Sequence, residues 1–133
     1  MRIRVAIMVA AFCAAVPLAT VDARPRVTGE EELARLLDGR VAGPPQNCIT
    51  TWPNSAMRAI DGTAYVFGSG RVIYVNRTRE PHRIDDDDIL VIRKFGSGTQ
   101  LCTHDIITTL DRGSQMYSGN VSLGDFIPYR LAK

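Results

Sequence analysis

Four consecutive carboxylates form the most conspicuous candidate site in the chain. The run consists of Asp85, Asp86, Asp87 and Asp88. Adjacent carboxylates repel one another unless a cation or nearby arginines offset their charge. A calcium loop, however, spaces its acids by one residue and places a glycine among them. We therefore interpret the run as a solvated turn, with divalent-cation binding as the alternative. The arginines that we expect to balance it are Arg77, Arg79, Arg83 and Arg93.

A second candidate is a hydrolytic set. It combines Glu80, His82 and His104 with an arginine, either Arg77 or Arg93. Small secreted ribonucleases place a carboxylate base, a histidine acid and a phosphate-binding arginine on an antiparallel sheet, and such acid–base chemistry needs groups with separated pKa values. Nothing in the spacing forces these side chains to converge, so a small hydrolase is an alternative rather than our preferred interpretation.

Two cysteines remain once Cys13 leaves with the N-terminal segment described below. In an oxidising compartment we expect Cys48 and Cys102 to form a disulfide. Closing a loop of this length stabilises a fold by about 4 kcal/mol in the chain-entropy model. The alternative is a metal site built from these cysteines with His104 and His82, although the spacing matches no zinc pattern.

Trp52, the only tryptophan, precedes Pro53 and is therefore expected in an extended or turn segment. The simplest interpretation packs its indole over the predicted disulfide. The alternative makes Trp52 an exposed, partner-binding anchor.

The N-terminus predicts export. Residues 1–4 form a short start made basic by Arg2 and Arg4, residues 5–19 are apolar apart from Pro17, and Val21 and Ala23 supply small residues for a signal peptidase. We expect cleavage after Ala23, a periplasmic or extracellular location, and no stable membrane insertion of the mature chain.

The composition limits the function classes. The chain has 133 residues, of which 45% are hydrophobic and 23% charged, and a formal net charge of +2. This length supports one modest core and excludes a two-domain cofactor enzyme, so we expect no cofactor. The weak charge gives no basis for a nucleic-acid partner.

Residues 24–47 predict one helix and a linker. Thr28 and Glu31 fit a capping box, and a helix from Gly29 to about Asp38 would bury a leucine stripe. The stripe consists of Leu33, Leu36 and Leu37. A Gly/Pro segment then leads to Cys48.

Residues 48–133 predict a disulfide-stapled β-rich domain. Residues 64–67 and 72–75 form a hairpin around a Ser69–Gly70 turn, which would set Phe67 opposite Val72. Because this hairpin is apolar on both faces, we expect it to be central. Further strands are expected at 57–60, 89–95, 106–110 and 121–129. The predicted fold class is α+β, mostly β, with one N-terminal helix and a small antiparallel sheet or barrel of about five to seven strands.

Several short motifs together resemble an uncharacterised family of small exported proteins from alphaproteobacteria, of the sphingomonad type. They are Gly39, Arg40, Ala42, Gly43, Pro45, Cys48 and Ile49; Ile60 and Asp61; residues 74–77; residues 85–91; Leu101, Cys102 and Asp105; and Leu123, Gly124, Phe126, Pro128 and Tyr129. Some members of that family carry two further cysteines, near the positions of His82 and Val121. Their joint absence here implies that Cys48 and Cys102 form the other bridge. The resemblance implies no activity, substrate or cofactor, and Trp52 departs from its pattern.

We therefore expect a non-enzymatic envelope module that binds or inhibits an unknown partner protein or ligand. A small secreted hydrolase and a divalent-cation-binding protein are the alternatives.

Overall fold

The structure, a computed structural model, describes residues 26–52, 55–96 and 98–133. The predicted signal peptide at residues 1–23 lies outside the described residues. Strands make up 43% of the structure and helices 11%. This confirms a mostly β fold with one N-terminal α-helix and antiparallel sheets.

The α-helix forms where its capping residues predict it. Helix α1 spans Gly29–Leu37, the Thr28 side chain accepts a hydrogen bond from the Glu31 amide, and the Glu31 carboxylate accepts one from the Thr28 amide. Leu33 is fully buried, while Leu36 and Leu37 pack beside it. The helix therefore docks by the predicted narrow apolar stripe.

The largest sheet has five antiparallel strands in the order β1-β10-β5-β4-β3. These are β1 (Arg40–Ala42), β10 (Phe126–Leu131), β5 (Val72–Asn76), β4 (Ala64–Phe67) and β3 (Met57–Ile60). The β4–β5 hairpin thus lies inside the sheet, as its two apolar faces predicted.

The register of this hairpin differs from the expected one. Phe67 lies opposite Tyr74 rather than Val72, so the two-residue turn is wrong and the loop is longer. Gly68 and Gly70 both have positive φ, and the Arg40 guanidinium donates to the Gly70 carbonyl at 2.9 Å. The Gly70 carbonyl thus points toward Arg40, and the loop does not close as a tight two-residue turn. A shift of two residues keeps every side chain on its predicted face.

Two smaller sheets complete the fold. One has the order β6-β8-β9 and the other pairs β2 with β7. The strands are β6 (Ile89–Arg93), β8 (Ile106–Leu110), β9 (Tyr117–Ser122), β2 (Cys48–Thr50) and β7 (Gln100–Cys102), with a short 3-10 helix η1 (Pro81–Arg83) before β6. The described residues form more strands than expected for two reasons. Strands β1, β2 and β7 are only three residues long and were not predicted. In addition, a break after Ser122 divides the last predicted strand into β9 and β10.

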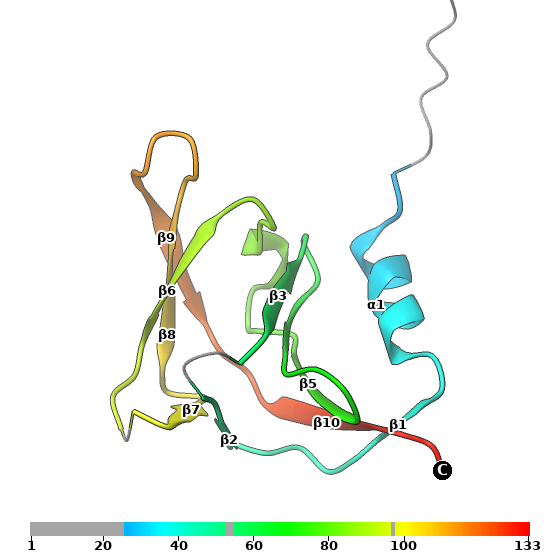
Figure 1. Cartoon of the computed structure of the whole chain (residues 1–133). Helices are drawn as coiled ribbons and strands as arrows, with labels where there is room; N and C mark the ends of the chain where they lie inside the picture. The colour runs from blue at the N-terminus through cyan, green and yellow to red at the C-terminus, as the bar shows by residue number, and fades with distance from the viewer. Residues whose placement is uncertain (1–25, 53–54, 97) are drawn as a thin grey trace, which may run out of the picture.

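The five-stranded sheet is covered on both faces. On one face, α1 packs against a cluster that includes Val66 and Val75. On the other, Tyr65, Phe67 and Phe126 pack against residues from both smaller sheets. Figure 1 shows α1 on one side of β3, β5 and β10, and β6, β8 and β9 on the other. No helix in the described ranges is long and apolar enough to cross a membrane.

Candidate functional site

The predicted disulfide is present. Cys48 and Cys102 lie directly opposite each other in the β2–β7 ladder, and their sulfur atoms are 2.04 Å apart. Because both thiols are consumed, the alternative metal site that would have used them with His104 and His82 lacks its two sulfur ligands.

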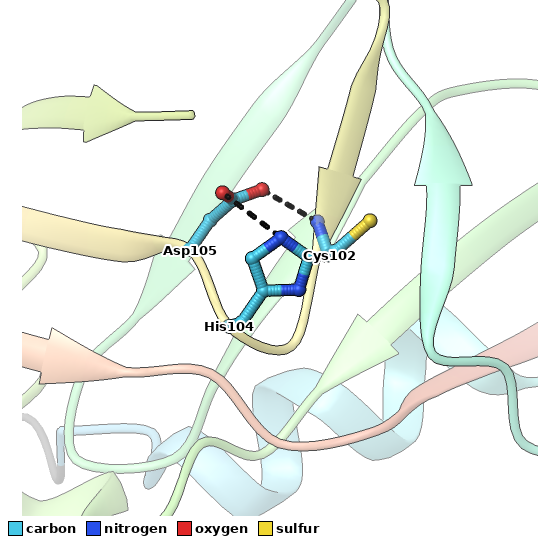
Figure 2. A group of neighbouring side chains, drawn as sticks. All are labelled: Cys102, His104 and Asp105. Carbon is cyan, nitrogen blue, oxygen red and sulfur yellow. Dashed lines mark hydrogen bonds and ion pairs between the residues drawn. The ribbon is translucent and has the colours of Figure 1, made fainter. Parts of the chain in front are cut away.

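Figure 2 shows why the neighbourhood of Cys102 still looks like a metal site. Ligand atoms of Cys102, His104 and Asp105 lie within 4.8 Å of one another. The Asp105 carboxylate is buried, however, and accepts hydrogen bonds of 2.7 Å from the Cys102 amide and the Phe95 amide. The Cys102 sulfur is thus held in the disulfide, and the Asp105 carboxylate is bonded to backbone amides. Asp105 thereby fixes the β7–β8 turn to the segment that follows β6.

The acidic run forms a turn, but not the expected ion pairs. The Asp87 amide donates to the Asp85 side chain at 2.8 Å, which is a local turn bond. Arg112 pairs with Asp87, although the sequence pointed to arginines at 77, 79, 83 and 93. Arg112 follows β8 and is far from the run in sequence, and the antiparallel pairing of β6 with β8, in which Ile89 lies opposite Leu110, brings the two together.

Two members of the acidic run approach a third carboxylate. Oxygens of Asp61, Asp85 and Asp86 lie within 4.8 Å of one another, and all three residues are exposed. Asp88 instead accepts a hydrogen bond from Ser118 at 3.1 Å. The four aspartates therefore do not act as one ligand set.

The structure does not bring the hydrolytic set together. His82 belongs to η1 and lines a polar cleft, whereas His104 follows β7 and does not line that cleft. Glu80 pairs with Arg83 at 3.6 Å. The Arg77 guanidinium is bonded to the Glu30 carboxylate of α1, and this hydrogen bond lowers the pKa of Glu30.

His82 lines a polar cleft of about 380 Å³. The other lining side chains include Asp61, Arg83, Asp85, Asp88, Thr109, Asp111, Ser118 and Asn120. Within the described residues no hydrogen bond or ion pair orients the His82 ring, and the Arg83 charge is already balanced by Glu80. Of the predicted hydrolytic set this cleft contains only His82, because neither Glu80 nor His104 lines it.

Trp52 is exposed rather than enclosed in the core. Its relative exposure is 68%, and the hydroxyl of Ser55 accepts a hydrogen bond from the Trp52 amide at 2.7 Å. The indole lines a groove of about 160 Å³, whose other lining residues are Thr51, Ser55, Met57, Phe67, Ile92 and Lys94. Of its two interpretations, an exposed anchor agrees with this geometry.

The groove opens between two sheet edges. Met57 begins β3, the edge of the five-stranded sheet, and Ile92 lies on β6, the edge of the three-stranded sheet. Its volume suits one or two side chains and is too small for a cofactor or a drug-sized ligand. The Lys94 ammonium donates to Thr51 and to the Gly98 carbonyl, at 2.8 and 2.9 Å. No carboxylate of the described residues neutralises it.

A larger cavity, of about 290 Å³, lies between α1 and the β4–β5 loop. Its two cations are already engaged: Arg40 donates to backbone carbonyls and Arg58 approaches Glu32 at 3.8 Å. The groove beside Trp52 is the better candidate for a partner, because a large exposed aromatic side chain lines it.

Sequence reasoning identified Trp52 but missed the residues that complete the groove. Met57 follows Trp52 by five residues, whereas Ile92 and Lys94 come from a segment about forty residues away. No local signal could have joined them, because their proximity depends on how the sheets pack.

No protein-family model, curated protein or solved structure matches the chain. The resemblance to exported alphaproteobacterial proteins thus stays a prediction.

Proposed function

We propose that the protein is an exported, non-enzymatic binding module that holds a partner polypeptide at the Trp52 groove. The single observation that carries this proposal is the exposed indole at the mouth of an apolar groove. Large exposed aromatic side chains beside small pockets are typical anchors of protein interfaces. The disulfide is compatible with export to an oxidising compartment.

The chemistry of the groove suggests what the partner presents. Met57, Phe67 and Ile92 supply apolar walls, so the partner would insert a bulky apolar side chain. Lys94, at the groove, offers a positive charge that no described carboxylate balances. A carboxylate next to the inserted side chain would form an ion pair with the Lys94 ammonium. The favoured partner is therefore an extended segment with an apolar residue beside an acidic one.

The test is a selection from a phage-displayed library of random short peptides against the exported, disulfide-bonded protein. We expect the selected peptides to share a bulky apolar residue next to Asp or Glu. Trp52→Ala should weaken their binding about tenfold or more, because truncating an interface tryptophan costs roughly 2 kcal/mol. Calorimetry of one selected peptide with each variant measures this.

Tyr117→Ala is the matched control. Tyr117 is 64% exposed, close to the value for Trp52, but lies at the start of β9 and does not line the groove. Its removal should leave peptide affinity unchanged. If no peptides are enriched, or if those selected bind Trp52→Ala as tightly as the parent protein, the proposed site is wrong.

A further inference from the structure

Strand β6 is open along one side. Each of its five residues pairs with β8, and no backbone hydrogen bond joins Ile89–Arg93 to any other segment in the described part of the chain. Alternate amides and carbonyls of an edge strand point away from its neighbour and can pair with another strand. Val91 is also 40% exposed. An open, apolar edge of this kind is what β-augmentation requires.

The charges at the two ends of β6 are opposite. The aspartates at 85–88 precede the strand, and Arg93 with Lys94 ends it. The Arg93 side chain is exposed, and its guanidinium makes no hydrogen bond or ion pair with the described residues. A strand that is acidic at one end, apolar in the middle and basic at the other is complementary to an antiparallel copy of itself.

We propose that two copies of this chain associate through antiparallel pairing of their β6 strands, forming one sheet of six strands. A twofold axis perpendicular to a sheet places one residue opposite itself. Centring on Leu90 sets Asp87 of each copy opposite Arg93 of the other, and this is the register that we propose. Asp87 already pairs with Arg112 of its own chain at 3.2 Å, but its side chain is 83% exposed and can approach a second cation.

This pairing does not require the Trp52 indole, because it rests on the backbone edge of β6 and the charges at its ends, although Ile92 of β6 also lines the Trp52 groove. A single short ladder buries less surface than a standard stable interface. The dimer should therefore be reversible and concentration-dependent, and it should weaken as salt screens the end charges.

Sedimentation velocity of the disulfide-bonded protein, from ~10 µM to ~1 mM, tests the proposal in the range where weak dimers form. Asp87→Arg and Arg93→Asp each place like charges together at both ends, and we expect each to weaken association about tenfold. Both side chains are exposed, but Asp87→Arg also removes the ion pair with Arg112, so urea unfolding should compare the stability of each variant with that of the original protein.

Mixing the two single variants distinguishes this dimer from other contacts. In the mixed pair, the two arginines of one chain face the two aspartates of the other, so association should return to the level of the original protein. The double variant should likewise self-associate. If the original protein stays monomeric throughout, or if mixing the single variants fails to restore association, β6 does not pair with itself and the inference is wrong.

Discussion

Strands β5 and β6 have the same length and nearly the same apolar character, yet they occupy opposite environments. The sequence of β5 is Val-Ile-Tyr-Val-Asn and that of β6 is Ile-Leu-Val-Ile-Arg. β5 lies between β10 and β4, and Ile73, Val75 and Asn76 are buried. β6 has β8 on one side only, and Val91 and Arg93 are exposed.

This difference separates the parts of the molecule that carry stability from those available for recognition. The central sheet buries apolar groups against a layer on each face, so a change there leaves a cavity. The β6 edge contributes half-buried side chains and leaves main-chain groups available to another strand. The predictions below test this separation.

The largest effect on stability should come from truncating a buried phenylalanine of the central sheet, with an exposed phenylalanine after β6 as the comparison. Phe126 on β10 is fully buried, and the centre of its ring lies 5.6 Å from the centre of the Phe67 ring. Phe126→Ala should lower the free energy of unfolding by about 3–5 kcal/mol. Phe95, which follows β6, is 65% exposed, so Phe95→Ala should change it by less than about 0.5 kcal/mol. Urea unfolding measures both, and equal losses would contradict the separation.

Removing the disulfide should have the next largest effect. The double variant Cys48→Ala, Cys102→Ala should lose about 2–4 kcal/mol, because the unfolded chain is no longer closed across a separation of 54 residues. Hydrogen exchange should show this loss in the slowest amides of β5, because they exchange through unfolding of the whole chain, and at least as large a loss in β2 and β7. Unchanged protection of β5 would mean that the bridge acts only on the ladder that it joins.

The smallest effect concerns the buried phenol of Tyr65 on β4. Its hydroxyl is buried and has no hydrogen-bond partner in the described part of the molecule. Burial, and secondarily the nearby charge of Asp88, raises the pKa of Tyr65 to about 12. The fold thus favours the neutral phenol, and stability that is fully present below pH 10 should fall as pH rises from 10 to 12.

Tyr65→Phe should remove this alkaline loss and should stabilise the protein by up to about 1 kcal/mol, since an unsatisfied hydroxyl disappears. Urea unfolding at neutral and strongly alkaline pH tests both effects. Tyr117→Phe, at an exposed tyrosine, is the control and should retain the original pH dependence. A marked loss of stability in Tyr65→Phe would show that the hydroxyl has a partner.

Local patterns predicted elements well but contacts poorly. The capping box at Thr28 and the strands at 57–60, 64–67 and 106–110 agree with the structure. The hairpin loop after Phe67 was misjudged, because its geometry depends on Arg40 from a distant segment. The Asp87–Arg112 pair was missed for the same reason.

The sequence by itself determined where the helix and most strands begin and which faces are apolar, and it predicted that Cys48 pairs with Cys102. Those properties depend on side-chain period, capping groups and turn residues within a few positions of one another. The two apolar faces of the β4–β5 hairpin also indicated its central position. The tertiary structure alone decided that β6, which is equally apolar, is an edge, and that Trp52, Met57 and Ile92 share one groove. Strand order follows from contacts between distant segments, so the local sequence of β6 carries no signal of which neighbours it will have.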